Sequence, residues 1–433
     1  MRFGIENIDI TPPFKTTMGG YASRQGLFDK VNDPLACTVI ILEEHDRRAV
    51  IVAADLITFN NNYTAALRQQ LAGIANTVPD NVLLNASHTH GGPEVSDKEM
   101  YFDKDRDTAA SIRYQAWLDQ QICEATVTAM NNLKTGSLWY GVGKSIIPMN
   151  RRLERDAKIV NAPNPNGQVD DCLQLLALKD QDGKLCALGV RLSCHPVATG
   201  AQSLITADFP GAFKKACVEE LGSDVVPFFL QGAGGDMRPR AVADGDKWRQ
   251  MAHDELPKIG QQLLKETLAI FNSDAMEELG ALELDGYFRY VKAECEHFYT
   301  TKEDFQKLAK SKINIEQLYA KNCLRELEAG RIIPDSTDIS VQTLWLTKDL
   351  AIIGIQGEVL VALGAYVASS ILAPNRSILL GYSNGSVCYL PDTKELQRGG
   401  YEQISYLYKG WTGQFKPGLE KTLAAAVCQQ AKE

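Results

Sequence analysis

The residues best suited to chemistry begin with two histidines, His88 and His90, in the stretch NVLLNASHTHGGP (81–93). They follow a short apolar run and precede two glycines. In an extended strand, residues two positions apart point to the same side, so both imidazoles would face one space. Two neutral imidazoles on a stiff backbone suit zinc, whereas the alternative is a polar turn with two solvated histidines.

A third histidine and a glutamate occupy the same kind of position. His195 ends the apolar run VRLSC and precedes a proline, and Glu358 follows a strand-like run and a glycine in IIGIQGEV. Rigid strand ends commonly present catalytic groups, although a lone histidine there also serves as a structural residue. We expect Glu358 to open a helix, where the helix dipole favours a carboxylate without any metal.

The stretch FFLQGAGGDMRPR (228–240) runs from a very apolar strand into glycines. Gly234 and Gly235 would allow positive φ angles and a close approach of backbone N–H groups to a ligand, and the alternative is a flexible turn. Asp236, directly after them, could orient a histidine from behind. The segment is therefore a candidate substrate-binding loop with a supporting carboxylate.

Regular elements must bring these segments together. Apolar alternation and apolar runs predict strands over 2–10, 37–44, 48–56, 81–87, 136–145, 171–180, 185–194, 224–232, 278–294 and 339–355. Helical spacing predicts helices over 61–76, 108–133, 210–222, 246–271 with a break at Pro257, 302–310, 314–329, 358–372 and 417–433. Thr300 and Glu303 form a possible capping box. Strands joined by hairpins and by helices imply an α/β protein with mixed β-sheets and flanking helices.

Length and composition limit the possible classes. The chain has 433 residues, 45% of them hydrophobic, which is enough for a large core. A net charge of −9 without a basic cluster argues against a nucleic-acid partner, and no apolar run is long enough for a transmembrane segment. Ten scattered cysteines without a CxxC pair, and an N-terminus without a signal peptide, predict reduced thiols and a cytoplasmic location. The oligomeric state is left open.

Several short motifs, in sequence order, resemble those of the neutral ceramidase family, the neutral/alkaline non-lysosomal ceramidases. They are FGIENIDITPP, MGGYASR and DPL near the start, then NASHTHGGP, MNRR, SCHP, QGEV and CYLPDTKELQRGGYE. The resemblance implies that residues 1–433 form a single neutral-ceramidase-like catalytic domain, without the family's C-terminal immunoglobulin-like domain. The charged helical segment 290–335 is then an insertion, which we expect to cap the site.

The resemblance also implies roles for individual residues. The implied zinc ligands are His88, His195, Glu358 and Tyr389. The residues implied to surround the scissile carbonyl are His90, Arg151 and Tyr401. A phenol is a rare zinc ligand, and composition alone would not nominate it.

One position departs from the family's pattern. Arg238 stands where the family has an essential serine after Gly-Asp-Val. A zinc ion can lower the pKa of its bound water to about 7 and so supply a nucleophile without a serine. Arg151, Tyr401 or His90 could stabilise the oxyanion, and His90 could protonate the leaving group. Arg238 would then bind a carboxylate or phosphate of the substrate, or pair with a neighbouring aspartate.

The sequence therefore predicts a zinc-dependent hydrolase that is not a true ceramidase. It would cleave the amide (C–N) bond of a small substrate, anionic if Arg238 binds it, through a zinc-activated water. The alternatives are hydrolysis of an ester, lactone or sugar-linked bond on the same metal, or a non-catalytic relative that binds a ligand. Two histidines and a phenol suit zinc better than magnesium, and an unused set of buried ligands would be costly to keep.

Overall fold

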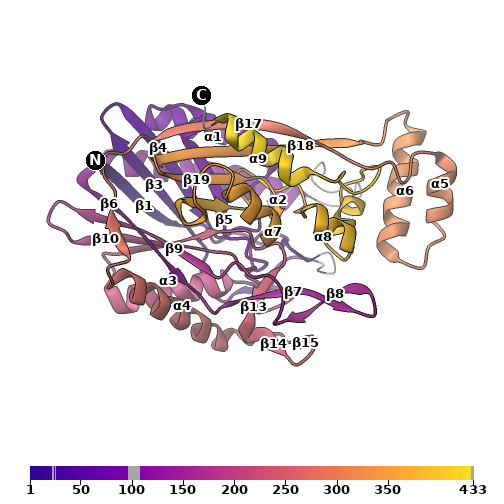
Figure 1. Ribbon diagram of the computed structural model, residues 1–433, viewed down its shortest axis with the longest axis horizontal. Helices are drawn as coiled ribbons and strands as arrows, with labels where there is room; N and C mark the ends of the chain where they lie inside the picture. The colour runs from indigo at the N-terminus through magenta and orange to yellow at the C-terminus, as the bar shows by residue number, and fades with distance from the viewer. Residues whose placement is uncertain (22–23, 25, 96–107, 431–433) are drawn as a thin grey trace.

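The computed structural model describes residues 1–21, 24, 26–95 and 108–430. Part of the MGGYASR motif (22–23) and the end of the predicted C-terminal helix (431–433) lie outside the described residues. Within the described part, a nine-stranded sheet and a four-stranded sheet face each other, and helices cover both outer faces (Figure 1). The predicted architecture of mixed sheets with flanking helices is confirmed.

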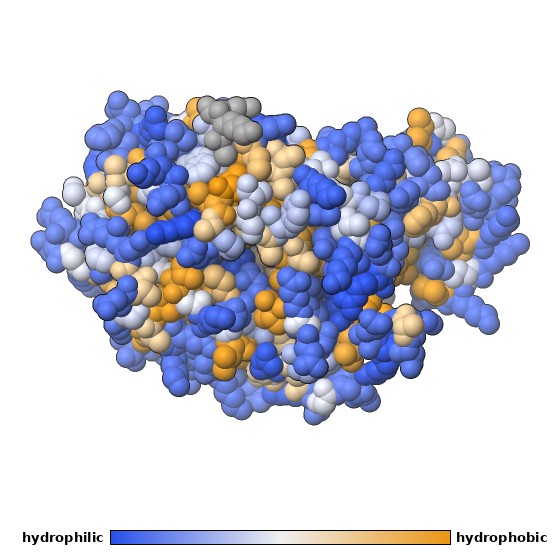
Figure 2. Space-filling view, in the orientation of Figure 1, coloured by the Kyte–Doolittle hydropathy of each residue, from blue (hydrophilic) through white to orange (hydrophobic). Residues whose placement is uncertain are grey.

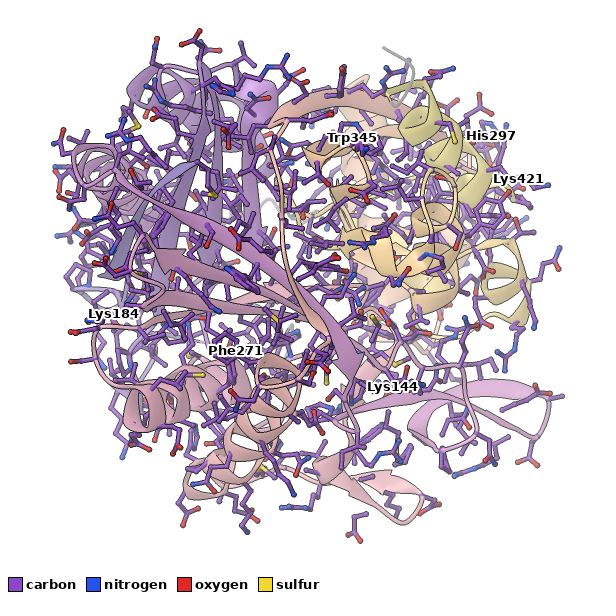
Figure 3. All side chains as sticks on the ribbon, turned by 60° about the vertical axis from the view of Figure 1, so that its left-hand side comes forward. Lys144, Lys184, Phe271, His297, Trp345 and Lys421 are labelled. Carbon is purple, nitrogen blue, oxygen red and sulfur yellow. The ribbon has the colours of Figure 1, made fainter. Side chains whose placement is uncertain are left out.

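The larger sheet mixes antiparallel and parallel neighbours. Its strands, in spatial order, are β12 (Val226–Gln231), β10 (Leu185–Leu192), β9 (Cys172–Asp180), β6 (Lys134–Lys144), β1 (Arg2–Asp9), β3 (Ala36–Glu44), β4 (Arg47–Ala54) and β5 (Val82–Ala86), with β16 (Met276–Glu278) beside β6. The pairs β4–β5 and β10–β12 are parallel, because helices α1 (Asn61–Ala75) and α3 (Asp208–Leu221) connect their strands. In Figure 3, Lys144 marks the end of β6, and Lys184 lies just before β10.

Strand β3 shows why the apolar runs of this sheet are continuous. Val39 and Ile41 pack toward α1 and α2 (Ala109–Asn131), whereas Ile40 and Leu42 pack toward the second sheet. Successive side chains of a strand point to opposite faces, so one run supplies two cores. Helices α3 and α4 (Leu256–Phe271) cover the same outer face over β9, β10 and β12.

The second sheet repeats this division. Its order is β17 (Asp285–Glu294), β18 (Ser336–Thr347), β19 (Leu350–Ile355) and β21 (Ser377–Leu380). Leu344 and Ile352 are paired across β18 and β19 and face the larger sheet, whereas Ile353 packs with α7 (Val361–Ala368) and α9 (Leu419–Gln430). None of the described helices is long and apolar enough to cross a membrane.

Helices α5 (Lys302–Leu308) and α6 (Asn314–Glu328) lie between β17 and β18 in the chain and form one end of the molecule (Figure 1). They confirm the helices predicted over 302–310 and 314–329. The capping box is one residue later than predicted, because the Thr301 side chain accepts from the backbone N–H of Asp304. Figure 2 shows apolar residues interspersed among hydrophilic ones at this end.

Two predicted helices begin later than expected. The helix predicted over 246–271 starts at Leu256, after β15 (Lys247–Trp248) and a 3₁₀ turn (His253–Glu255). Pro257 does not break it but lies in its first turn, where a missing N–H is tolerated. The helix predicted from residue 358 begins at Val361, and Glu358 belongs to a short strand instead.

Short elements at one end of the sheets hold the segments of interest. They are β7 (Pro148–Arg155), β8 (Lys158–Asn164), β13 (Met237–Pro239), β20 (Glu358–Val359), β22 (Tyr389–Leu390), α8 (Thr393–Arg398) and the 3₁₀ helix η5 (Gln403–Tyr408). Two further short pairs are β2 (Lys30–Val31) with β11 (Leu204–Ile205) and β14 (Ala243–Asp244) with β15. All ten cysteines are free, as predicted, and seven of them are buried.

Candidate functional site

Three predicted ligands from distant parts of the chain meet at one carboxylate oxygen. His88 Nε2 lies 3.3 Å from Glu358 Oε2, and His195 Nε2 lies 3.1 Å from the same oxygen. All three side chains are at least four-fifths buried. A cation placed among these atoms would have two imidazole nitrogens and a carboxylate as ligands, which is a donor set typical of zinc.

Backbone carbonyls set the orientation of both imidazoles. Nδ1 of His88 lies 2.6 Å from the carbonyl oxygen of Ile57, and Nδ1 of His195 lies 2.6 Å from that of Gly234. A carbonyl only accepts, so each Nδ1 carries the proton and donates. Each Nε2 therefore presents a lone pair to the shared space, the arrangement that metal-binding histidines adopt.

His88 and His90 face one space, as predicted, but not because they lie in a strand. Strand β5 ends at Ala86, and His88 has a left-handed backbone conformation with φ 65°. This conformation is uncommon for a residue with a side chain and is typical of strained functional positions. It turns the chain so that Nε2 of His90 lies 3.3 Å from Nε2 of His88.

His90 completes a cluster of three histidines. The ligand atoms of His88, His90 and His195 all lie within 4.8 Å of one another. Burial and the neighbouring imidazoles hold the pKa of His90 well below its usual range, and burial lowers the pKa of His195 to about 4. His90 and His195 are therefore neutral at pH 7, the form in which imidazole binds metals and accepts protons.

Glu358 is ionised although it is buried. Burial by itself raises the pKa of a carboxyl, but the imidazoles of His88 and His195 hold the pKa of Glu358 well below its usual range. Its strand β20 pairs in parallel with β22, and Glu358 is directly opposite Tyr389. The prediction that Glu358 opens a helix is wrong, because this pairing keeps the backbone extended through Val359.

Two tyrosines and an arginine form the next part of the wall. The ring of Tyr389 stacks on that of His195 with centroids 6.4 Å apart, and its centroid lies 5.5 Å from that of Tyr401. The guanidinium of Arg151 lies 5.2 Å from the centroid of Tyr389 and 6.0 Å from that of Tyr401. Tyr389 is buried, whereas Tyr401 is 42% exposed, so Tyr401 lies toward solvent.

A buried glutamate that the sequence analysis missed holds this arginine. Arg151 Nε lies 3.0 Å from Glu402 Oε1, and Arg152 Nη1 pairs with the other oxygen of Glu402. Arg152 also binds Glu395, at 2.7 Å. The motifs containing these residues were recognised separately, but no local pattern indicates that MNRR and GGYE meet through ion pairs.

Asp236 has different partners from those predicted. Its oxygens accept from the backbone N–H of Val361 at 2.9 Å and from the side chain of Asn150 at 3.3 Å. Asp236 does not orient His88 or His195, because the Nδ1 atoms of these two histidines already donate to backbone carbonyls. Burial raises the pKa of Asp236 to about 7. Asp236 therefore links β7, β13 and the start of α7 behind the site.

The two glycines also act differently from the prediction. Neither Gly234 nor Gly235 has a positive φ. Their N–H groups donate to the carbonyls of Gly232 and Val359, at 2.9 and 2.8 Å, so they do not reach toward a ligand. Gly235 instead allows two backbone segments to pack closely, since a Cβ on it would lie 2.6 Å from the carbonyl oxygen of Glu358. The carbonyl of Gly234 orients His195.

Arg238 lines the site without an acidic partner. Among the described residues it forms no ion pair, so the predicted alternative of pairing with an aspartate is not seen. Its Nη2 lies 3.5 Å from the carbonyl oxygen of Val197, and its guanidinium lies 4.8 Å from the Trp248 ring centroid. Its buried Nε has no hydrogen-bond partner within residues 1–21, 24, 26–95 and 108–430. Burial lowers the pKa of Arg238 to about 10, which leaves it charged at pH 7.

A cavity of about 430 Å³ opens onto these groups. Its wall includes seven of the predicted residues, namely His88, His90, Arg151, Arg238, Glu358, Tyr389 and Tyr401. Residues that the sequence analysis did not single out also line it, among them Tyr21, Lys409, and Ile315 and Leu318 of α6. The cavity therefore joins a polar, metal-type cluster to an apolar wall.

Tyr382 supports the cluster from behind and was missed. Its ring lies 4.1 Å from that of His88, and its fully buried hydroxyl has no hydrogen-bond partner among the described residues. Tyr382 also has a left-handed backbone conformation, with φ 52°. It follows Gly381 directly after β21, so the strand-end pattern used for His195 could have identified it.

The fold is similar to that of solved ceramidases. The neutral ceramidase of Pseudomonas aeruginosa is 25% identical over 307 residues, covering 67% of this chain and 44% of that protein. The chain thus spans less than half of that relative's length. Two solved structures, a neutral ceramidase from Pseudomonas aeruginosa and a ceramidase complexed with C2, match with TM-scores of 0.72 and 0.73 at 20% identity.

These structural matches cover 99% of this chain and 74% and 75% of the two solved chains. No family model matches the sequence. The resemblance to a neutral-ceramidase-like catalytic domain, which the sequence motifs predict, is confirmed by both the sequence match and the fold.

Proposed function

We propose that this protein is a zinc-dependent hydrolase that cleaves the amide (C–N) bond of a small substrate other than ceramide. The observation that carries this proposal is the meeting of His88 Nε2 and His195 Nε2 at one oxygen of Glu358. The residues fit zinc, because both imidazoles present lone pairs, the carboxylate is ionised and the phenol of Tyr389 lies beside them.

The proposed ligands are therefore the four that the resemblance implies: His88, His195, Glu358 and Tyr389. When bound, zinc supplies a water of lowered pKa and polarises the substrate carbonyl. His90 lies within the histidine cluster, with its Nε2 3.3 Å from that of His88, and we assign this Nε2 to proton transfer, the role beside the scissile carbonyl that the resemblance implies.

The remaining residues would manage charge and protons. Arg151, held in place by Glu402, would stabilise the negative charge that develops on the carbonyl oxygen, and the hydroxyl of Tyr401 would donate to the same oxygen. His90 is neutral at pH 7, so its Nε2 can accept a proton from the attacking water and pass it to the leaving amine.

Arg238 argues against ceramide as the substrate. It replaces the serine that the family uses, and its charge has no ion-pair partner among the described residues. A partly buried cation of this kind favours a substrate with a carboxylate or phosphate. Ceramide has neither group, so we propose a small anionic substrate and no nucleic-acid partner. The cytoplasmic location, the single domain and the insertion at 290–335 remain predictions, although Ile315 and Leu318 of α6 at the cavity support a capping role.

Elemental analysis and a substrate screen test this function together. We expect about one zinc per chain after gentle purification, hydrolysis of N-acyl amino acids, and loss of activity on chelation that zinc reverses. The screen should include esters, lactones and ceramide. Protein without zinc, full turnover after exhaustive chelation, or efficient ceramide cleavage would each contradict the proposal.

A matched pair of histidine variants separates the site from general effects. His195→Ala should lose both zinc and activity. His45→Ala should keep both, because the side chain of His45 is 88% exposed in the turn between β3 and β4. If the two variants retain equal amounts of zinc, His195 is not a ligand.

A further inference from the structure

We infer that the substrate is an N-acyl amino acid, with its carboxylate bound by Arg238 and its aliphatic acyl chain on the apolar wall that α6 contributes. This inference rests on the proposed function and deepens it. Hydrolysis would add the water oxygen to the acyl carbon, break the C–N bond and move a proton to the nitrogen. The products are a carboxylic acid and a free amino acid, and no other reactant is needed.

Arg238 is placed to bind a group next to the scissile bond. It lies on β13, opposite Met149 of β7, two residues before Arg151. Its guanidinium approaches the carbonyl of Val197, two residues after His195. An N-acyl amino acid carries its carboxylate one carbon away from the amide nitrogen, so a carboxylate at Arg238 would keep the amide close to the cluster.

The state of the guanidinium supports a carboxylate partner. Its Nε is buried without a hydrogen-bond partner in the described part of the chain, and its face lies against Trp248. The acidic group in its electrostatic range, Asp208, already accepts from the backbone N–H groups of Phe209 and Thr199. A carboxylate could bind Arg238 through two parallel hydrogen bonds and supply the missing acceptor.

The cations of the cavity wall differ in their acidic neighbours. Arg151 is ion-paired to Glu402, whereas Lys409 and Arg238 each have a carboxylate in electrostatic range, Glu358 and Asp208 respectively. Among the residues that the structure describes, Arg238 forms no ion pair, and its planar guanidinium, unlike the ammonium of Lys409, can bind a carboxylate through two parallel hydrogen bonds, so we assign the added anion to Arg238.

The aliphatic acyl chain of the proposed substrate requires an apolar surface, and α6 contributes one. Ile315 and Leu318 are one helical turn apart and line the cavity, whereas Tyr319 lies on the buried face of the helix. The hydroxyl of Tyr319 donates to the carbonyl of Trp411 at 2.5 Å and anchors the helix. Val387 and Leu407 extend the apolar wall.

A set of small probes tests the two halves of this inference. N-octanoylglycine and its neutral counterpart N-octanoylglycinamide differ only in the carboxylate, and N-acetylglycine shortens the acyl chain. We would measure kcat/KM by amine release and binding by calorimetry. Charge-assisted hydrogen bonds predict at least a tenfold preference for N-octanoylglycine over the amide, and each buried methylene about a fourfold preference over N-acetylglycine.

Variants assign each preference to its residue. Arg238→Gln should reduce the preference for the carboxylate to within twofold, mainly through KM, and Arg238→Lys should restore part of it. Arg240→Gln is the matched control, because the exposed side chain of Arg240 bonds the backbone carbonyls of Ile146 and Pro148. Leu318→Asn should reduce the chain-length preference, and Ile332→Asn, at an 89% exposed position outside the cavity lining, should not.

The results distinguish this inference from the proposed function. Cleavage of both glycine derivatives with equal efficiency overturns the inference but leaves zinc-dependent amide hydrolysis intact. A carboxylate preference that persists in Arg238→Gln, or that disappears in Lys409→Met instead, also overturns it. Binding of N-octanoylglycine that depends on Arg238, without cleavage of any amide, supports the ligand class and contradicts the hydrolase.

Discussion

Glu358 and Tyr389 are directly opposite each other on the parallel strands β20 and β22, although 30 residues separate them in the chain. Residues paired in this way project from the same face of a sheet, so the carboxylate and the phenol enter one space. The ring of Tyr389 also stacks on His195, which contacts Glu358 through Nε2. The backbone pairing of two short strands thereby positions two of the four proposed metal ligands.

Removal of the Tyr389 hydroxyl tests whether the phenol is a ligand. Tyr389→Phe keeps the ring against His195 but removes the oxygen. We expect a loss of at least tenfold in zinc affinity with an unchanged fold, since even residues that only orient ligands contribute that much. Competition with a chromogenic chelator measures the affinity. Tyr408→Phe, at another tyrosine of the cavity wall, is the control, and equal affinities in the two variants would show that Tyr389 does not bind zinc.

The buried hydroxyl of Tyr382 leads to a prediction about stability. An unsatisfied buried polar group destabilises a fold by about 1–3 kcal/mol. Tyr382→Phe should therefore raise the free energy of unfolding by about 1 kcal/mol, whereas Tyr382→Leu should lower it by about 2–4 kcal/mol through lost packing on His88. Urea denaturation of the metal-free protein measures both. A less stable Tyr382→Phe variant would mean that the hydroxyl has a partner.

Glu402 should be important for both stability and activity. It is 2% exposed and neutralises Arg151 and Arg152, so Glu402→Ala would leave two buried guanidinium groups without this partner. We expect a loss of about 3–5 kcal/mol in the free energy of unfolding. The exposed pair Lys184–Asp224 provides the contrast, and Asp224→Ala should leave stability nearly unchanged because solvent screens this pair. Similar losses in the two variants would contradict the importance of burial.

Asp208 predicts a pH dependence of stability. Burial raises its pKa from 3.8 to about 6, so between these values the folded state binds more protons than the unfolded state. Stability conferred by this group is therefore fully present well below pH 3.8 and is lost as the pH rises through 6, by roughly 3 kcal/mol in total.

The Asp208→Asn variant lacks this titration and should tolerate the left-handed backbone at this position, with φ 55°. Urea unfolding at pH 4, 5, 6 and 7 should show the wild type losing roughly 2 kcal/mol more than the variant across the series, because part of the loss already occurs below pH 4. A difference of the opposite sign would show that the carboxyl is ionised in the folded state throughout this range.

Local patterns in the sequence determined most of the regular structure. The apolar run of β3 is continuous because its alternate residues pack into two different cores, and such a run predicts a strand. The spacing of apolar residues in 109–131 predicts α2 because one face of that helix is buried. The two histidine segments were also identifiable, since a histidine where an apolar strand ends is a local pattern. The alternation of a strand and the spacing of a buried helix face repeat within a few residues, so both can be recognised in a single sequence.

The tertiary structure alone decided which partner each polar group has. Glu358 is in a strand rather than a helix because β22, from a distant segment, pairs with it. Asp236 bonds Val361 and not a histidine because carbonyls already occupy both Nδ1 atoms. Which hydrogen-bond partner a polar group has depends on which distant segments pack against it. Local patterns in the sequence therefore could not specify these partners.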